Sequence, residues 1–264
     1  MQVSLIITTF NRPDALLLVL KSIELQSVIP NEIIIADDGS SDSTKKCIAS
    51  FKKKSNLRLI HSWQSDKGFR VAESRNKAIL QSSYEYIILI DGDMLLHQKY
   101  IEDHINNSQL GFFVQGPRVF LNPGVTKNAL KNSKTNFSFF SKGLRNRKNS
   151  LHSTFFAKLF ESKKNHLKGI KACNLAFYKE DCIEINGFNN DMKGWGREDS
   201  EFVARLINNG IRRKNVHFSL IQFHLWHQKS EKNYLLKNEE ILQNTIKKKL
   251  KTCANGLNYF TDTN

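Results

Sequence analysis

The stretch that decides the fold is Tyr86-Ile87-Ile88-Leu89-Ile90-Asp91-Gly92-Asp93-Met94. Five apolar residues lead into two acids separated by one glycine, which predicts a buried β-strand that ends at Asp91. Sheets in α/β proteins bind their ligands at the carboxyl ends of their strands. Two carboxylates are costly to hold this close together unless a cation lies beside them. We therefore expect a divalent ion, bound together with a diphosphate, at this strand end.

Strand and helix patterns alternate through the first part of the chain. We predict strands over residues 3–9, 32–37, 57–62 and 86–91, with helices after Pro13, from Ser41 or Asp42 to about Lys53, and over 71–82. This alternation is typical of a parallel sheet with crossover helices. After Gly111 the rhythm breaks, and we expect strands over 112–120, 171–178 and 216–224, helices over 198–209 and 235–250, and a mobile loop over 141–150.

Composition limits the class of protein. The 264 residues suffice for one large α/β domain or a core domain with an extension, and a hydrophobic share of 40% supports a real core. The longest apolar run, Ala15–Leu20, has six residues, whereas a membrane span needs roughly 20. No secretory signal is apparent. The four cysteines are scattered without a Cys-x-x-Cys motif, so we expect reduced thiols in a cytoplasmic protein.

A strongly basic segment covers residues 127–171. It contains twelve Lys or Arg residues and one acid, Glu161, for a net charge of +11 in a chain of net charge +15. Phenylalanines are interleaved with these cations at positions 137, 139, 140, 155, 156 and 160. Such a surface suits anionic lipid headgroups, an acidic glycan or nucleic acid. A solvated basic face over a small aromatic core is the other interpretation, and peripheral contact with the inner face of the cytoplasmic membrane stays open.

Three acidic clusters end or follow predicted strands. They are Asp37-Asp38, Asp91-Gly92-Asp93 and Glu198-Asp199. Each is weak alone, because an Asp-Asp-Gly-Ser run often only forms a turn and caps a helix. In a wound sheet, however, the first two clusters would converge on one edge. Their order and their placement at strand ends favour a functional site.

The chain resembles family 2 glycosyltransferases with the GT-A fold. The matching residues are Ser4–Thr9 with Asn11-Arg12, Asp37–Ser40, Gly68–Arg70 with Arg75-Asn76, and Asp91–Asp93. A second resemblance, to β1,4-galactosyltransferases and bacterial chondroitin-type polymerases, lies in Asn174–Phe177 and Gly194–Glu201. The Trp-Gly-x-Glu-Asp pattern is the most specific of these motifs. Together the two resemblances cover most of residues 3–228.

The first resemblance implies a site for a UDP-sugar. Asp38, or its neighbour Asp37, would accept a hydrogen bond from the uracil N–H, a role that suits a carboxylate. Arg75 would lie near the base or the diphosphate, because its planar fork can donate two bonds at once. Asp91 would contact the ribose or the metal. The remaining nucleotide-binding positions implied by the motifs are Thr8, Phe10, Arg12 and Gly92.

The resemblance also implies a metal site. Asp93 would bind Mn²⁺ or Mg²⁺, which both favour oxygen ligands, and the ion would stabilise the departing nucleoside diphosphate. In galactosyltransferase-like enzymes a histidine, and the residue three before it, complete this site. The matching positions are His227, the stronger candidate, and His224. Both can ligate only if the strand has ended by His224, and imidazole favours Mn²⁺ over Mg²⁺.

The second resemblance implies an acceptor site around residues 194–201. Asp199 matches the family's general base, which takes the proton from the attacking hydroxyl, and Glu198 would hold the acceptor sugar. A helix start favours the ionised form that a base requires. Trp195 offers an apolar face to a sugar ring, and its flanking glycines allow a loop to close over the donor. Gly196 and Asn174 complete the implied acceptor set, while Arg197 stands where the family often has glycine.

The implied fold is a Rossmann-like nucleotide-binding mixed sheet flanked by helices, with a basic helical insertion and a C-terminal helix. One GT-A domain would cover residues 1–228, with a nucleotide-sugar-binding half at 1–110 and an acceptor-binding half at 111–228. A basic helical extension would cover 229–264.

The implied function is metal-dependent, inverting transfer of a hexose or N-acetylhexosamine from a UDP-sugar to a glycan. The acceptor would be a bacterial surface polysaccharide or lipooligosaccharide, as a lipid-linked saccharide. Two alternatives use the same residues differently. The charge of +15 could serve a polyanion- or nucleic-acid-binding protein, although we expect no nucleic acid because this leaves the acidic clusters unexplained. A GT-A homologue that only binds glycans is the other alternative.

Overall fold

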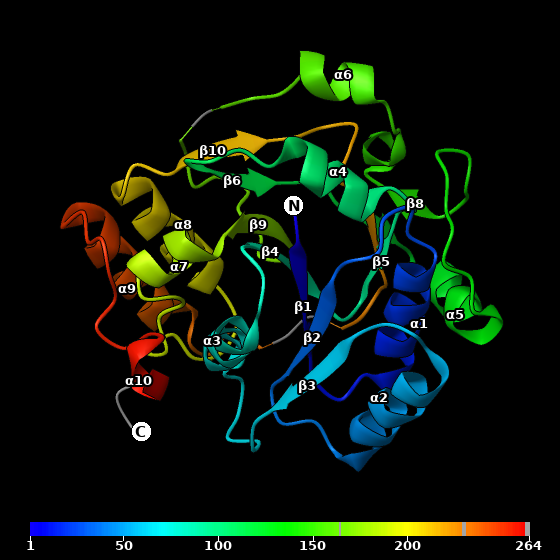
Figure 1. Ribbon diagram of the computed structural model, residues 1–264, viewed down its shortest axis with the longest axis horizontal. Coiled ribbons are helices and arrows are strands. Elements are labelled where there is room, and N and C mark those ends of the chain that lie inside the picture. The colour runs from blue at the N-terminus through cyan, green and yellow to red at the C-terminus, as the bar shows by residue number, and fades with distance from the viewer. Residues whose placement is uncertain (164, 229–230, 262–264) are drawn as a thin grey trace.

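A mixed seven-stranded sheet forms the centre of the molecule, which is described from a computed structural model. The structure describes residues 1–163, 165–228 and 231–261. The strand order is β10-β6-β9-β4-β1-β2-β3, and only β9 runs antiparallel to its neighbours (Figure 1). The strands are β1 (Val3–Thr9), β2 (Glu32–Asp37), β3 (Leu59–Trp63), β4 (Tyr86–Asp91), β6 (Phe112–Gln115), β9 (Asn174–Tyr178) and β10 (Arg212–Asn215).

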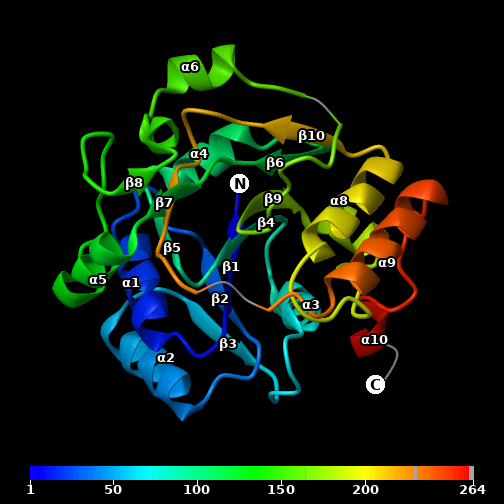
Figure 2. The ribbon, with the colours of Figure 1, turned by 180° about the vertical axis from the view of Figure 1, so that it is seen from behind.

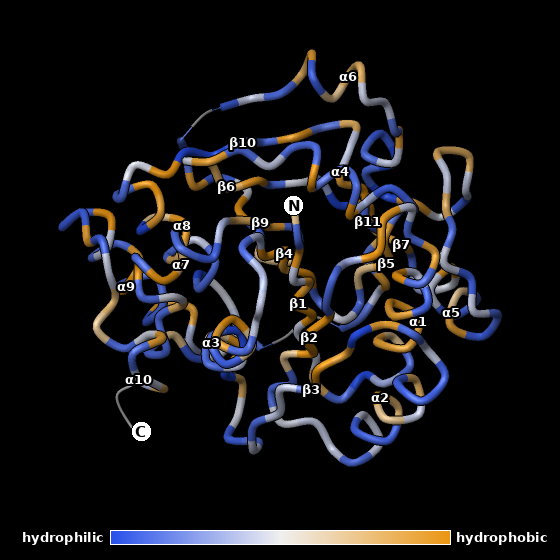
Figure 3. Tube along the Cα trace, viewed as in Figure 1, coloured by the Kyte–Doolittle hydropathy of each residue, from blue (hydrophilic) through white to orange (hydrophobic). Residues whose placement is uncertain are grey.

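Helices cover both faces of this sheet (Figures 1 and 2). Alternate side chains of a strand point to opposite faces, so Leu5 and Ile7 join one core cluster and Ile6 joins the other. The central strands are hydrophobic along their length (Figure 3). The first cluster is packed by α1 (Pro13–Glu24), α2 (Asp42–Lys54), α4 (Tyr100–Asn107) and α5 (Pro123–Asn132), and the second by α3 (Val71–Gln81), α7 (Lys179–Glu184) and α8 (Glu198–Asn208).

A second sheet, of four short strands, extends beyond the end of β4. Its order is β5-β11-β7-β8, and its strands are β5 (Met94–Leu96), β7 (Val119–Leu121), β8 (Leu144–Arg145) and β11 (Gln222–His224). The antiparallel register of β11 with β5 places His224 opposite Met94. A residue far along the chain therefore lies beside the acidic end of β4.

Three further helical elements complete the described chain. These are α6 (Thr154–Leu159), α9 (Leu235–Lys247) and α10 (Asn258–Thr261), and a single 3-10 turn covers Arg147–Ser150. Helix α9 packs against α8, whereas α6 lies at the outer edge of the molecule, apart from the sheet (Figures 1 and 2). Within the described residues, no helix combines the length and apolarity needed to cross a membrane.

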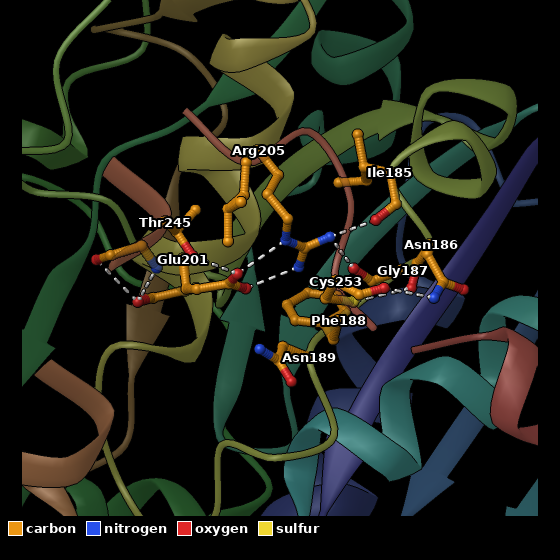
Figure 4. Close-up of polar contacts among 12 residues, drawn as sticks. Ile185, Asn186, Gly187, Phe188, Asn189, Glu201, Arg205, Thr245 and Cys253 are labelled. Atoms are coloured by element: carbon orange, nitrogen blue, oxygen red, sulfur yellow. Dashed lines mark hydrogen bonds and ion pairs between the residues drawn. The ribbon is translucent and has the colours of Figure 1, made fainter. Parts of the chain in front are cut away.

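A buried Arg205–Glu201 pair holds α8 in place (Figure 4). The guanidinium donates to both oxygens of Glu201, at 2.9 and 2.7 Å, and to the backbone carbonyls of Ile185 and Gly187. Thr245 of α9 donates a further bond to Glu201 at 3.1 Å. Arg205 is completely buried, so these bonds replace its hydration. The network fixes the helix whose first residues are Glu198 and Asp199.

The predicted strands over 3–9, 32–37 and 86–91 are confirmed residue for residue. The prediction of a single strand over 112–120 is wrong. The strand is interrupted at Gly116-Pro117, and the segments before and after this point join different sheets. The strand expected over 216–224 shortens to β11, since Phe218 and Leu220 adopt positive φ angles that no strand continues. The expected loop over 141–150 contains β8 and a 3-10 turn.

Candidate active site

Asp93 and two histidines form the first part of the site. The Nε2 atoms of His224 and His227 each lie 3.4 Å from Oδ2 of Asp93, and Nη1 of Arg12 lies 3.2 Å from the same oxygen. Burial raises the pKa of Asp93, but the hydrogen bond and charge of His224, with the charges of His227 and Arg12, outweigh burial and hold it below its usual value. The carboxylate is therefore ionised at neutral pH.

The local fold explains why histidines three residues apart converge. Strand β11 ends at His224, and the next amide, that of Leu225, donates to the backbone carbonyl of Asp93 at 2.9 Å. The turn that follows brings His227 back toward Asp93. Its Nδ1 lies 2.5 Å from the carbonyl of Gln228, which favours a proton on Nδ1 and leaves the Nε2 lone pair for a ligand. The condition set by the sequence, that the strand ends by His224, is met.

The residues present fit a divalent cation. Asp93 Oδ1 is buried and has no partner within the described chain, although buried carboxylate oxygens are rarely left unpaired. One carboxylate and two imidazoles, all within 4.8 Å of one another, form a donor set that suits Mn²⁺ better than Mg²⁺.

A second histidine cluster has its own internal partners. His97, Asp103 and His152 also lie within 4.8 Å of one another. Both oxygens of Asp103 contact Nε2 of His152, at 3.1 and 3.0 Å, and one of them accepts a bond from the Leu220 amide. His97 Nδ1 accepts from the Lys99 amide at 3.3 Å. These bonds explain the second cluster without an ion.

Arg75 links the acidic end of β4 to the start of α8. It is only 4% exposed, and its guanidinium lies 3.5 Å from Asp91 Oδ1 and 3.3 Å from Glu198 Oε1. Thr8 donates a 2.8 Å hydrogen bond to the same oxygen of Asp91. One cation thus holds together two acidic clusters that are more than 100 residues apart in the sequence. Glu198 Oε2 stays buried without a partner among the described residues.

Asp199 begins α8 beside this ion pair. Its Oδ1 accepts bonds from the backbone and hydroxyl of Ser200, at 2.7 and 3.3 Å, and no bond to Oδ2 is found in the described part of the chain. Burial, assisted by the negative charge of Glu198, raises the pKa of Asp199 to about 7, although Arg75 opposes the shift. A carboxyl group with this pKa can accept and release a proton near neutral pH, as a general base must.

The two acids after β2 differ in their surroundings. Asp37 is fully buried, with its oxygens bound by His61 at 2.8 Å and by the Ser40 amide at 2.8 Å. Asp38 accepts bonds from the Arg70 amide and the Gln64 side chain, and burial raises its pKa to about 6. This placement favours Asp38, which is 6% exposed, as the residue that faces a ligand.

Gly92 and Phe10 also lie along this edge of the sheet. The Gly92 amide donates to the Thr8 carbonyl at 2.7 Å, and a Cβ atom on Gly92 would lie 2.9 Å from that oxygen, so a side chain does not fit. Phe10 is 46% exposed at the end of β1. Trp63, 52% exposed and opposite Asp37 in the register of β2 with β3, is a candidate that the sequence reasoning missed. Its place at a strand end was the available signal.

The loop before α8 carries an exposed Trp195. Its indole is 45% exposed, with Lys232 Nζ 5.7 Å from the ring centroid. Gly194 and Gly196 have φ angles of +69° and +108°, which suit glycine. Asn238 of α9 donates to the carbonyls of Lys193 and Gly196 at 2.9 and 2.8 Å. Glycine is therefore required at these two positions by the backbone geometry of a loop that Asn238 holds in place. The sequence alone did not indicate this reason.

One expectation for the acceptor side needs correction. Asn174 is completely buried, and its amide contacts Tyr100, His104 and the carbonyls of Pro117 and Leu220. It stabilises the junction of the two sheets and has no free atom for an acceptor. Arg197, at the position where the family often has glycine, pairs with Glu239 of α9.

Comparisons with known proteins agree with this fold and find related glycosyltransferases. Residues 4–168 match the model of Glycosyl transferase family 2, and residues 153–228 match the N-terminal domain of galactosyltransferase. Hyaluronan synthase of Pasteurella multocida is 30% identical over 235 residues, which cover 81% of this chain and 23% of that protein. Chondroitin synthase of Pasteurella multocida is 27% identical over 226 residues, covering 78% of this chain and 23% of that protein.

A solved structure supports the fold independently. That of S. aureus TarS residues 1–349 in complex with UDP superposes with a TM-score of 0.62 at 15% identity, covering 92% of this chain and 64% of that one. The GT-A fold, a mixed sheet with helices on both faces, is confirmed. The chain belongs to glycosyl transferase family 2, with a galactosyltransferase-like region in its second half. It spans about a quarter of the length of the two curated synthases described above.

Proposed function

We propose that this chain transfers a sugar, a hexose or N-acetylhexosamine, from a UDP-sugar to a hydroxyl group of a glycan, with inversion and with the help of Mn²⁺. The observation that carries the proposal is that Arg75 joins two acidic clusters, through Asp91 and Glu198, while Asp93 of the first cluster meets His224 and His227. A solved complex of S. aureus TarS with UDP-GlcNAc, and the two synthases named above, support the donor class and the glycan acceptor.

The residues divide the work by their position. Asp93, His224 and His227 would hold the ion, which supplies positive charge against the diphosphate when bound. Arg12, on the same side of Asp93, can donate to a phosphate. Asp38, with Phe10 and Trp63 nearby in the strand order, would hold the uridine. Arg75 is neutralised by its two acids, so its main effect is to position them.

Asp199 would act on the acceptor. Its carboxylate takes the proton of the attacking hydroxyl while the new glycosidic bond forms at the anomeric carbon and the bond to the diphosphate breaks. UDP leaves with the electron pair of the broken bond. Glu198, fixed by Arg75, has an unpartnered oxygen that can accept a hydroxyl of the acceptor sugar. Trp195 provides an exposed apolar face for that ring.

A donor screen tests this proposal. The protein would be incubated with UDP-glucose, UDP-galactose and their N-acetylamino counterparts, with Mn²⁺ or with a chelator, and released UDP measured by mass spectrometry. We expect one donor to be turned over in the presence of Mn²⁺ and none with the chelator. Indifference to every UDP-sugar, together with tight and salt-sensitive binding of oligonucleotides, would favour the polyanion-binding alternative instead.

The outer surface around α6 favours a membrane as the place of action. Phe155, Leu159 and Phe160 are 70%, 62% and 53% exposed, in a segment whose sequence is strongly basic. Apolar side chains among cations suit an anionic bilayer surface, because the lipid headgroups attract the charges and the acyl region accepts the rings. We propose peripheral contact through this surface, with a lipid-linked saccharide as the acceptor.

A further inference from the structure

A basic pocket lies between the loop after β6 and the segment that leads into β9. Its volume is about 330 Å³. Its lining includes no Asp or Glu. Six basic side chains line it, namely Arg118, Lys168, Lys171, Arg213, His166 and His217. Like charges are rarely collected in a concave site without an anion to balance them.

Arg213 is the buried member of this set. It is 4% exposed, and its Nη1 donates to the carbonyls of His166 and Lys168 at 3.0 and 2.8 Å. No carboxylate pairs with it in the described part of the chain, and its buried Nε has no partner there. A buried guanidinium without a counter-charge is costly. In contrast, Arg205, which is completely buried, has its own glutamate.

Arg118 gives the pocket a second unpartnered donor. Its Nε is buried without a partner among the described residues, while Nη1 contacts the Cys173 sulfur at 3.5 Å and the guanidinium lies 4.5 Å from the Phe120 ring. The surrounding backbone is fixed, since Gln115 donates to the Lys171 carbonyl at 3.0 Å and Asn149 donates to the Arg118 carbonyl at 3.0 Å. The backbone that carries Arg118 and Lys171 is therefore held in place before any ligand arrives.

The pocket adjoins the candidate active site. Cys173, which touches Arg118, precedes Asn174, and Asn174 pairs with Ile90, the residue before Asp91. Lys171 lies close enough to Asp199 for the carboxylate charge to act on it. Because Asp199 is the residue proposed to act on the acceptor, a pocket beside it is positioned to meet the acceptor.

We propose that this pocket binds an anionic group of the acceptor glycan, a carboxylate or phosphate next to the sugar that receives the transfer. The inference rests on the proposed function and specifies its acceptor class. Lys168 and Lys171 belong to the basic segment 127–171, whose charges the sequence alone could not assign. The segment is thus divided: its last residues line the pocket, and its phenylalanines on α6 face outward.

Binding of small acidic probes tests the proposal. The double variant Lys168→Gln/Lys171→Gln would be compared with Lys52→Gln/Lys53→Gln, which makes the same charge change on exposed positions of α2. Titration calorimetry would measure the affinity of each protein for three ligands: a glucuronic-acid-terminated disaccharide, a neutral disaccharide of equal size and inorganic phosphate. We expect the acidic disaccharide to bind about tenfold or more tightly than the neutral one, and the pocket variant to lose that advantage, in line with charge-assisted bonds. The control variant should keep it.

Several results would overturn the proposal. Equal binding of acidic and neutral disaccharides would do so, as would an equal loss in both double variants, which would indicate nonspecific charge. Binding of anionic vesicles alone, lost in the pocket variant, would assign the cations to a membrane.

Binding of phosphate but not the uronate would support a phosphate-bearing acceptor. UDP affinity with Mn²⁺ is measured in parallel. Absence of UDP binding in the unaltered protein would refute the proposed function. If the pocket variant retains UDP affinity, its loss of acid binding can be assigned to the pocket alone.

Discussion

At the scale of single residues, the site depends on how charges are balanced. Asp93 is kept ionised by cationic neighbours although it is buried. By contrast, burial and the negative charge of Glu198 raise the pKa of Asp199 to about 7. The same side chain can thus serve as a metal ligand at one position and as a base at another, because the local electrostatics differ.

Replacement of Asp93 tests the metal site. We expect Asp93→Ala to lower Mn²⁺ affinity by more than about 100-fold, since even residues outside the first coordination sphere contribute up to that amount. His227→Ala should also weaken it. The matched control is His97→Ala, in the internally bonded histidine cluster, which should leave the affinity unchanged. The metal content after dialysis would be measured by atomic emission, and full retention of Mn²⁺ by Asp93→Ala would rule out the site.

Replacement of Asp199 by asparagine separates binding from chemistry. The amide keeps the size of the side chain but cannot take a proton, so transfer should fall by about 100-fold or more while UDP affinity stays within about twofold of the unaltered protein. Transfer rates and calorimetric UDP titrations would be measured on the same preparation. Near-normal transfer by Asp199→Asn would mean that another group is the base.

The pKa of Asp199 also predicts a pH dependence. A base with a pKa of about 7 is protonated below that pH, so kcat/KM should fall about tenfold for each pH unit below about 6 and reach a plateau above about 8. Initial rates across this range would show the fall in kcat/KM at low pH, and a flat profile would contradict the assignment.

The pKa of Asp199 also gives the effect of pH on stability a defined sign. Because the folded pKa exceeds the unfolded one, the unaltered protein should lose stability relative to Asp199→Asn as the pH rises toward about 7, measured as a difference in Tm.

At the scale of elements, α8 connects stability to the site. Its start carries Glu198 and Asp199, and one turn further along, the buried pair of Glu201 and Arg205 anchors the helix to the backbone before Phe188 and to α9. The position of the candidate base therefore depends on contacts that do not touch the substrate.

Loss of that anchor should destabilise the protein. Arg205→Ala leaves Glu201 charged and buried, so we expect a loss of about 3–5 kcal/mol in the free energy of unfolding. The partly exposed pair of Arg197 and Glu239 offers a control, and Arg197→Ala should cost no more than about 1 kcal/mol. Urea unfolding followed by circular dichroism would measure both, and similar values for the two variants would contradict the role assigned to burial.

At the scale of the whole molecule, the acidic active site and the outer surface around α6 are separated. The active-site acids lie at one edge of the central sheet, while the basic segment reaches outward to α6, at the margin of the molecule (Figure 2). This separation would allow the protein to contact an anionic surface without covering its donor site.

Membrane contact can be tested at that surface. Phe155→Ser/Phe160→Ser should abolish flotation with anionic liposomes, because it removes exposed rings without changing charge. Leu110→Ser, at a 77% exposed position outside the basic segment, is the control and should float normally. Neutral liposomes should bind neither the unaltered protein nor either of these variants. If the unaltered protein fails to float with anionic liposomes, the α6 surface has another role.

The sequence determined the central strands β1, β2 and β4, the family and the types of residue at the site, because apolar runs and strand-end acids are local patterns. It could not show that β11 ends at His224, that Asn174 is consumed by the core, or that Arg75 joins acids from two ends of the chain. Those features depend on packing between distant segments. The division of the basic segment into a pocket and an outer surface is likewise tertiary, because charge in a sequence has no direction until the backbone has a path.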